Sequence, residues 1–465
     1  MTYWLDAVGM SRQDSSVSNR QSRRSLLKLL GGTGAAGMAG LAGCAGSGDG
    51  GSDGGGSGDG DSDGSSGDGG SGDGGSTSTT TSTSSSGGES VKVGFLHPLT
   101  GPLSAGGEAQ ERGAKIAVSH VNEDLGGIGG RPVEAVYEDT ETDPATGREK
   151  ARKLVENDDV DVLIGAVSGA VSLSVADYAY DAQTIYFPYG GSESITGSEC
   201  KPTTFRYQYS ASQSARAGAK WALENLGTNV WIHFADYSFG QSIRDTWRAA
   251  MEESGIDHNV VNVTKTPLGT SDYSSYISQI QSSEADWVLQ AFSGSDAINF
   301  LKQAEQFGMK ESVDIMSSLN AYQPLRQGAG TAAVGTYGLI RYNRRYDSPE
   351  NQALIDRHVA AYDTPPTDHA LNMWTCLRLY AKGVDQAGSL ELGDVIPALE
   401  GMESEEPMGP VTLRACDHQA VRDYPIGEIV EPTDYEWPDL KINATLPGDQ
   451  ITESCEESQC DMPSL

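Results

Sequence analysis

The thiol of Cys44 has the clearest chemical context of any reactive side chain in this sequence. It ends the run Leu41-Ala42-Gly43-Cys44, which has the form of a lipobox, where the chain is cut before the cysteine and the thiol receives a lipid. Upstream, Arg23-Arg24 and a following stretch of small and apolar residues have the form of a twin-arginine export signal. We therefore expect residues 1–44 to be a signal peptide and Cys44 to anchor the mature protein on the extracellular face of the cell membrane.

A transmembrane helix is the alternative for this first segment. The stretch from Leu26 to Ala42 is short for a span and contains Lys28 and several glycines, which favours the signal peptide. Residues 45–90 are almost all Gly, Ser, Asp and Thr. Because such a segment cannot bury apolar surface, we expect a disordered tether between the lipid anchor and a folded part.

The reactive side chains beyond the tether show no catalytic pattern. After residue 90 the sequence contains neither a Gly-x-Ser-x-Gly nucleophile elbow nor a His-Glu-x-x-His motif, and no Cys-x-x-Cys pair that would indicate zinc. The histidines are scattered, at positions 97, 120, 233, 258, 358, 369 and 418. His97 and His418 could face a cleft, but a lone histidine is more often structural. We expect no enzyme, metal or cofactor, and a secreted amidohydrolase is the disfavoured alternative.

The cysteines after the lipobox indicate disulfides, because the expected compartment is oxidising. Cys376 lies in a helical pattern of apolar residues and is expected to be a buried free thiol. The others, Cys200, Cys416, Cys455 and Cys460, allow three pairings. We expect Cys416 to pair with Cys455 or Cys460.

The charge balance restricts the possible partners. Asp and Glu total 65 against 32 Lys and Arg, which gives a net charge of −33 and a pI near 4.4. No basic face is available to neutralise phosphates, so a nucleic-acid partner is excluded. Carboxylates spread along the whole chain are typical of proteins that work in concentrated salt, where their repulsion is screened.

Strand and helix patterns alternate along the folded part, which predicts βαβ units and parallel sheets. Expected strands are 91–96, 132–137, 161–165, 184–188, 230–234, 259–264 and 286–292, and short strands that return across the hinge are expected within 411–440. Expected helices are 108–122, 145–156, 171–181, 215–226, 241–254, 273–281, 297–307, 352–362, 369–387 and 392–400. The part after residue 90 is too long for one core. We expect one lobe from 91–212 and 342–415, a second from 213–341, and a hinge return with a C-terminal segment in 416–465.

Several motifs between residues 91 and 430 resemble one family. They are Gly94-Phe95-Leu96-His97-Pro98-Leu99-Thr100-Gly101, Gly126-Gly127-Ile128-Gly129-Gly130-Arg131, Glu138-Asp139-Thr140 with Asp143-Pro144, Ile164-Gly165 with Ser168, Phe239-Gly240 and Asp417-His418-Gln419. Their order and spacing are similar to type I extracellular solute-binding proteins, the branched-chain amino-acid, amide and urea binders of ABC importers. The resemblance implies an α/β, two-lobed, periplasmic-binding-protein-like type I fold, with two doubly wound parallel sheets joined by a three-crossover hinge.

The resemblance also implies a ligand site in the cleft between the lobes. Its expected contacts are Ser168, Gly169, Ala170, Gly190, Gly191, Ser192, Tyr237, Phe239, Ser293 and Asn320. The turn at Ser168 precedes a helix, and a helix N-terminus offers unpaired N–H donors to a carboxylate or carbonyl. The glycines at 190 and 191 let the backbone approach a small ligand closely. In this interpretation a solute is captured by hinge closure and delivered to the membrane permease subunits of an ABC importer.

One departure from the family pattern concerns the ligand ammonium group. Amino-acid binders of this family hold it with an acidic residue, whereas this sequence has Ser317-Ser318-Leu319-Asn320-Ala321-Tyr322 at the corresponding place. A desolvated ammonium without a counter-charge costs several kcal/mol. A neutral amide or urea is therefore a competing ligand, unless Asp236 or Asp296 supplies the charge. A sensory protein of the same fold, reporting to a partner receptor, is the alternative to transport.

Overall fold

The computed structural model describes residues 90–317 and 322–465, except for the side chain of Ser238. The predicted signal peptide, Cys44, nearly all of the tether and Asn320 lie outside these residues, so the expectations for them stay predictions. In the part of the chain that is described, no helix combines the length and the apolar character needed to cross a membrane.

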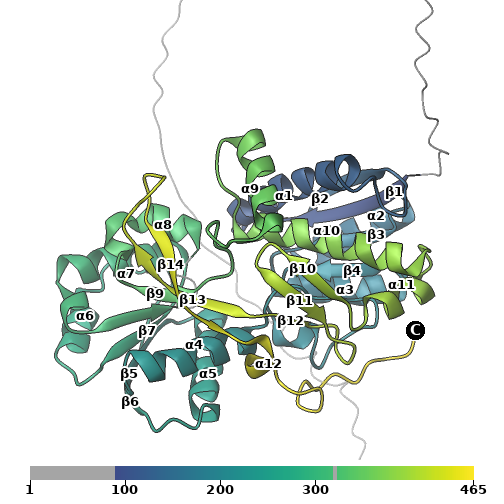
Figure 1. Cartoon of the computed structure of the whole chain (residues 1–465). Coiled ribbons are helices and arrows are strands. Elements are labelled where there is room, and N and C mark those ends of the chain that lie inside the picture. The colour runs from purple at the N-terminus through teal and green to yellow at the C-terminus, as the bar shows by residue number, and fades with distance from the viewer. Residues whose placement is uncertain (1–89, 318–321) are drawn as a thin grey trace, which may run out of the picture. The chain divides into compact units, whose positions relative to one another are not determined.

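The sheet of the first lobe is parallel, in the strand order β2-β1-β3-β4 (Figure 1). The strands are β1 Val91–His97, β2 Val133–Asp139, β3 Val162–Gly165 and β4 Ile185–Pro188. β3 and β4 are buried along their whole length. Continuous buried runs are expected where helices cover both faces of a parallel sheet.

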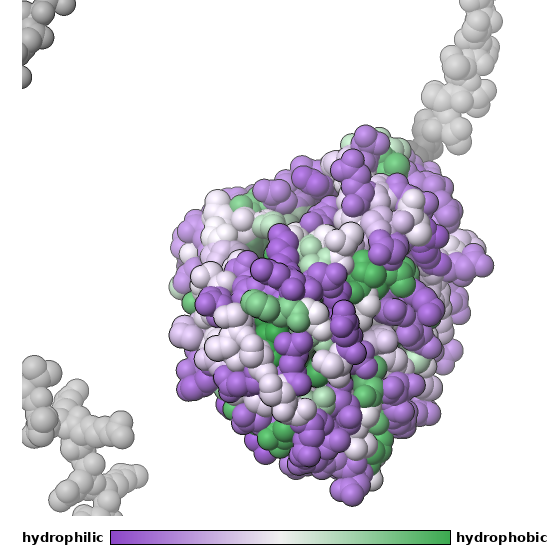
Figure 2. Space-filling view, turned by 90° about the vertical axis from the view of Figure 1, so that its left-hand side faces the viewer, coloured by the Kyte–Doolittle hydropathy of each residue, from purple (hydrophilic) through white to green (hydrophobic). Residues whose placement is uncertain are grey.

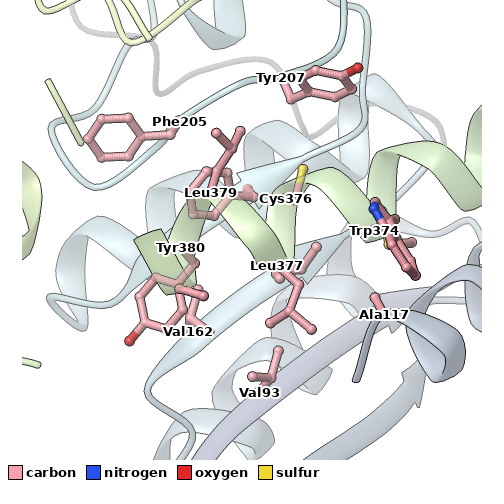
Figure 3. Close-up of a cluster of buried hydrophobic side chains, with 14 of the residues drawn as sticks. Val93, Ala117, Val162, Phe205, Tyr207, Trp374, Cys376, Leu377, Leu379 and Tyr380 are labelled. Carbon is pink, nitrogen blue, oxygen red and sulfur yellow. The ribbon is translucent and has the colours of Figure 1, made fainter. Parts of the chain in front are cut away.

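Helices cover both faces of this sheet, and each face has its own core. Their bounds are α1 Ser104–Glu123, α2 Pro144–Glu156, α3 Gly169–Asp181, α9 Pro349–Tyr362, α10 Asp368–Ala387 and α11 Leu392–Leu399. On one face, Val93 and Val162 share a buried cluster with Leu377 of α10 (Figure 3). Leu163 and Tyr186 face the opposite way and pack with residues of α2 and α3. This separation follows from the alternation of side chains along a strand.

The sheet of the second lobe is mixed, in the order β14-β13-β9-β8-β7-β5-β6 (Figure 1). Its strands are β5 Asn229–Ala235, β6 Asn259–Thr266, β7 Trp287–Ala291, β8 Asp314–Ser317, β9 Tyr337–Leu339, β13 Tyr424–Val430 and β14 Asp439–Leu446. β5 to β9 pair in parallel, whereas β13 is antiparallel to both β9 and β14. The prediction of two wholly parallel sheets was therefore wrong for this lobe, because residues 416–465 contribute two strands to its edge.

The helices of the second lobe also lie on both faces of their sheet. They are α4 Ala211–Asn225, α5 Ser238–Glu253, α6 Ser274–Gln281, α7 Gly294–Gln306 and α8 Gln323–Ala329, with the short α12 Gly448–Ile451 beside α4. Val288 and Ile315 share one core with Phe300 of α7. Ile232 and Leu289 share the other core with residues of α4 and α5.

The three hinge crossings follow β4, β9 and β12, as the predicted fold class requires, and the tail after α12 then returns to the first lobe. Before the last crossing, β10 Glu403–Glu406, β11 Gly409–Leu413 and β12 Ala420–Val421 form a small antiparallel sheet. Short strands were expected within 411–440, but neither β10 nor the pairing of the three strands was predicted. The face seen in Figure 2 is largely hydrophilic, with small separate groups of hydrophobic residues.

Two disulfides fasten the segment around the last crossing and the C-terminal tail. Cys416 pairs with Cys455, as expected, and Cys200 pairs with Cys460. Cys376 is buried and free, also as expected. The first bridge closes a short stretch of 39 residues, whereas the second joins positions 260 residues apart.

Candidate functional site

The turn between β3 and α3 presents the start of a helix at the carboxyl end of the parallel sheet. Gly165 and Ala166 both adopt positive φ angles, of 128° and 62°, which reverse the chain sharply. Ser168 then caps α3, and its hydroxyl makes no capping hydrogen bond. The first N–H groups of a helix lack partners within the helix. Ser168 and Gly169 are half-buried and Ala170 is exposed, so these donors border accessible space.

The loop after β4 packs directly against this helix start. A Cβ added at Gly190 would lie 2.9 Å from the Cα of Gly169 and 2.6 Å from the Oγ of Ser172. A Cβ at Gly169 would lie 3.0 Å from the Cβ of Ser192. The structure thus brings together Gly169, Gly190 and Ser192, residues that the sequence placed in one site, and the absence of side chains permits the close approach.

The predicted residues of the second lobe lie where its strands end and its helices begin. Tyr237 caps α5 after β5, and its ring lies 5.9 Å from that of Phe239, measured between centroids. Ser293 caps α7 after β7, and Tyr322 caps α8 after β8. Tyr237, Phe239, Ser293 and Tyr322 are all half-buried. Ligands of open α/β sheets bind beyond these carboxyl ends of the strands.

A polar cluster that the sequence analysis missed adjoins these residues, with two of its members buried and two half-buried. We call Tyr189, Arg341, Asp368 and His369 the Asp368 cluster. The hydroxyl of Tyr189 donates to Oδ2 of Asp368 at 2.8 Å, and Nδ1 of His369 lies 3.2 Å from Oδ1 of Asp368. The imidazole of His369 stacks on the ring of Tyr189 with 4.6 Å between centroids. A Cβ at Gly106 in α1 would lie 2.8 Å from Nε2 of His369, so the cluster joins α1, α10 and the loop after β4.

The electrostatics of the cluster keep Asp368 ionised. Burial acts to raise the pKa of the Asp368 carboxyl, but His369, then Arg341 and the hydroxyl of Tyr189 outweigh it and hold that pKa far below its usual range. Burial, followed by the negative charge of Asp368, raises the pKa of Tyr322 in the second lobe above its ordinary value. The field of this carboxylate therefore reaches residues of both lobes.

The carboxylates that the sequence suggested as substitutes for the missing counter-charge already have partners. Asp236 lies 2.8 Å from Nζ of Lys265 and accepts a hydrogen bond from Gln241. Asp296 is buried and accepts the backbone N–H of Gly269 with both oxygens, at 3.1 and 3.0 Å.

The two histidines considered for the cleft are instead packed in the interior. His97 and His418 are both fully buried. Nδ1 of His97 lies 3.3 Å from Oε1 of Gln110, and burial lowers the pKa of His97 to about 4. His418 stacks on Phe205 with 3.9 Å between ring centroids. Nε2 of His418 lies 3.1 Å from Oε1 of Glu400. The burial of both histidines agrees with the structural role expected of a lone histidine and not with the alternative, a position facing the cleft. Among residues 90–317 and 322–465, no His, Cys, Asp and Glu side chains group in a way that could hold a metal ion.

Comparison with known proteins agrees with this architecture. The family model described as "Periplasmic binding protein" matches residues 90–434. The Leu/Ile/Val-binding protein BraC3 of Rhizobium johnstonii is 26% identical over 326 residues, covering 69% of this chain and 87% of that protein. The Leu/Ile/Val-binding protein homolog 6 of Brucella melitensis biotype 1 is 24% identical over 354 residues, covering 74% of this chain and 88% of that protein.

Solved structures share the fold at low sequence identity. An amino acid ABC transporter substrate-binding protein from Pseudomonas fluorescens Pf-5 has a TM-score of 0.72 at 20% identity, covering 80% of this chain and 99% of that one. The closed leucine-, isoleucine-, valine-, threonine- and alanine-binding protein from Brucella ovis has a TM-score of 0.71 at 20% identity, covering 81% and 100%. A solute-binding protein from R. palustris in complex with benzoate has a TM-score of 0.65 at 24% identity, covering 76% and 96%. The chain belongs to the periplasmic binding protein family.

Proposed function

We propose that this protein is the substrate-binding receptor of an ABC importer and captures a small solute between its two lobes. The observation that carries the proposal is the packing of Gly190 and Ser192 against the start of α3, at the carboxyl ends of β3 and β4. This arrangement places backbone N–H groups and the hydroxyl of Ser168 side by side at a partly accessible helix start, and such donors suit a carboxylate or carbonyl. The relatives named as Leu/Ile/Val-binding proteins support a solute of amino-acid size.

The proposed mechanism is hinge closure without a chemical step. A solute that contacts both lobes favours the closed form, which then docks on the permease. To move a closed population from 1% to 99%, the solute must favour the closed form by about 5.5 kcal/mol. Hydrogen bonds from Ser168 on one lobe and from Tyr237, Ser293 or Asn320 on the other can supply energy of that order.

The charges around the site favour a ligand without a free ammonium group. Asp236 and Asp296 are engaged elsewhere, and Asp368 is paired within its own cluster. An ammonium that loses its water in the cleft would find no uncommitted carboxylate among these three groups. We therefore favour a carboxylic acid or amide of the size of a branched-chain amino acid, with the amino acid itself and urea as the competing ligands.

A thermal-shift and calorimetric series in concentrated KCl separates these ligands. It would compare L-leucine, 4-methylpentanoate, which has the same skeleton without the ammonium, 4-methylpentanamide and urea. A ligand at one hundred times its dissociation constant stabilises the folded state by about 2.7 kcal/mol. We expect 4-methylpentanoate or its amide to bind more tightly than leucine. Binding of leucine alone would contradict the ligand class, and no binding by any of them would contradict the solute site.

The variant Ser168→Ala tests the position of the site. The loss of its hydroxyl should weaken binding of the best ligand by about tenfold, because one hydrogen bond is lost while the fold keeps its core. Ser174→Ala is the matched control on the same helix, since the hydroxyl of Ser174 donates to the carbonyl of Pro144 at 2.9 Å. It should leave ligand affinity unchanged. Unchanged affinity in Ser168→Ala would remove that residue from the site.

We also propose that a lipid on Cys44 tethers the receptor to the extracellular face of the membrane, and that the acidic surface suits a concentrated salt medium. The support is the lipobox, the twin-arginine signal and the net charge of −33. Cys44→Ser should release the protein into the medium. A variant that still fractionates with membranes would exclude the lipid anchor.

Transport can be separated from sensing and from catalysis by following the solute. In the proposed function, deletion of the receptor abolishes uptake of the labelled ligand, and the purified protein returns the ligand chemically unchanged. Uptake that persists while a transcriptional or tactic response is lost would support the sensory alternative.

A further inference from the structure

The side chain of Arg206 lies fully inside the protein, next to the loop that borders the ligand site. It is 1% exposed and belongs to the first crossing between the lobes. Its Nη1 donates to the carbonyl oxygen of Ser192 and makes a longer contact of 3.5 Å to that of Gly190. Its Nη2 donates to the hydroxyl of Thr196. One guanidinium group thus holds both ends of the loop Gly190–Ser192.

The third side of the guanidinium is held by the segment that precedes the last crossing. Nε of Arg206 donates to Oε1 of Gln419 at 2.6 Å. The amide nitrogen of Gln419 in turn donates to the carbonyl of Gln208 at 3.0 Å. The backbones pair as well, because the N–H of Arg206 donates to the carbonyl of His418 and the N–H of Ala420 donates to the carbonyl of Arg206, both at 2.9 Å.

This segment is itself fastened to the C-terminal tail. Cys416 is bonded to Cys455, and the guanidinium of Arg414 pairs with Asp417 and donates to the carbonyl of Glu453. The backbone N–H of Gln419 donates to Oδ1 of Asp417 at 3.1 Å. A continuous chain of contacts therefore leads from the disulfide through Asp417 and Gln419 to Arg206.

Within the described part of the chain, the buried guanidinium of Arg206 forms hydrogen bonds with neutral groups and with no carboxylate. Its direct partners are the neutral oxygens of Gln419, Thr196 and the loop backbone. Burial lowers the pKa of Arg206 to about 10, although nearby carboxylates, Glu193 foremost, oppose that change. A buried cation with neutral partners requires those oxygens to be fixed in place. The loop carbonyls are therefore held as firmly as the guanidinium is.

We propose that Arg206 is a positioning residue for the ligand loop, and that the Cys416–Cys455 bridge maintains this position through Gln419. Peptide planes are rigid and trans, so fixing the carbonyls of Gly190 and Ser192 also directs the following N–H groups, those of Gly191 and Glu193, to the side away from Arg206. The effect on ligand binding rests on the proposed function, whereas the effect on loop order does not.

Hydrogen exchange of the purified protein without ligand tests loop order directly. Mass spectrometry would follow the peptide covering residues 189–195 in the wild type, Arg206→Met, Arg206→Lys and Gln419→Ala. Loss of the hydrogen bonds from the Arg206 guanidinium should speed exchange of the amides in residues 189–195 by about tenfold, because each lost hydrogen bond lowers the free energy of local opening. Arg206→Lys keeps the positive charge but not the planar set of N–H donors, so its exchange rate should lie between those of the wild type and Arg206→Met. It replaces Arg206→Met in the test if that variant does not fold.

Arg378→Met is the matched control. Arg378 is also a buried arginine of the first lobe, with its Nε 3.0 Å from a carboxylate oxygen of Glu406. Its other contacts are with His120 and with the carbonyl of Glu405, both away from the loop Gly190–Ser192. This variant should lower the free energy of unfolding of the protein. The exchange rate of residues 189–195, compared with that of the other peptides, should stay as in the wild type. The double variant Cys416→Ser with Cys455→Ser should speed loop exchange, by less than Arg206→Met does.

The outcomes separate the two proposals. Unchanged loop exchange in folded Arg206→Lys and Gln419→Ala variants would overturn the positioning role. Faster loop exchange together with weaker binding of 4-methylpentanoate or leucine supports it fully. Faster loop exchange in a protein that binds none of the tested solutes would leave Arg206 as a positioning residue and would overturn the proposed solute site instead.

Discussion

The hydroxyl of Tyr189 donates a 2.8 Å hydrogen bond to the carboxylate of Asp368, although the two residues lie 179 positions apart. This bond connects the loop after β4 with the first turn of α10. His369 adds a second contact by stacking on the same tyrosine ring. The segment after β4 is therefore held at Tyr189 by α10 and at Ser192 by Arg206.

Tyr189→Phe should remove this bond without changing the shape of the site. Asp368 would then stay buried and ionised with one donor fewer, which should lower the free energy of unfolding by about 2 kcal/mol, because hydrogen bonds to charged groups are the stronger ones. Urea unfolding in concentrated salt measures the loss. Tyr186→Phe is the control: its hydroxyl donates to the neutral carbonyl of Gly165 at 3.0 Å, and about 1 kcal/mol should be lost. Equal losses would show that the charge of Asp368 adds nothing.

Acid should destabilise the protein in a window set by its buried histidines. Burial lowers the pKa of His97 and of His233 from 6.5 to about 4. The unfolded chain therefore binds these protons more readily than the folded one. Stability is then constant above about pH 6.5 and falls as the pH drops from 6.5 towards 4, by about 3 kcal/mol for each histidine.

Denaturant unfolding at several pH values checks this window. His97→Gln should flatten the curve between pH 6.5 and 4. Asp368 has a pKa lowered by its partners, so its contribution is present above its unfolded pKa and is lost only at lower pH. A wild-type curve that stays flat down to pH 4 would contradict the neutral, buried state of both histidines.

The sequence predicted much of the first lobe because its signals are local. The run Val162–Gly165 and the helix after Ser168 are visible as a buried strand, a turn and a helix start. The sequence analysis did not predict that β13 and β14 join the sheet of the second lobe. Pairing at a sheet edge depends on partners that are distant in sequence. The available signal was the alternation of polar and apolar residues from Leu440 to Leu446, which the structure shows as exposed positions of β14 alternating with buried or half-buried ones.

The candidate site residues of the first lobe were named from motifs, whereas the Asp368 cluster was not predicted at all. Asp368 and His369 have the appearance of an ordinary helix start, with Thr367 as the cap. Their meeting with Tyr189 follows from the packing of α10 on the sheet, and no spacing in the sequence encodes it. The choice between Cys455 and Cys460 as the partner of Cys416 was undetermined for the same reason.

The contact between α3 and the ligand loop can be tested with two adjacent glycines. Gly190→Ala should cost about 1 to 3 kcal/mol, because its Cβ would lie 2.6 Å from the Oγ of Ser172 and 2.9 Å from the Cα of Gly169. Gly191→Ala should cost less than about 0.5 kcal/mol, because its nearest neighbour would be the carbonyl oxygen of Tyr209 at 3.8 Å. Thermal unfolding without ligand compares the two. Similar stability of both variants would contradict the close packing at Gly190.

The two disulfides should contribute unequally to global stability. A bridge restricts the unfolded chain more when it closes a longer loop. Cys200–Cys460 spans 260 residues and Cys416–Cys455 spans 39, so the chain-entropy model gives about 5.6 and about 3.9 kcal/mol for the two bridges.

Paired serine variants of each bridge, unfolded in urea, measure this difference. The double variant at Cys200 and Cys460 should show the lower unfolding free energy. Its tail should stay partly docked, because the hydroxyl of Tyr180 donates to the carbonyl of Ser464 at 2.7 Å. The double variant at Cys416 and Cys455 should instead show the greater loosening around Gln419. The reverse order of unfolding free energies would mean that native contacts near Cys416, and not loop length, determine what each bridge contributes.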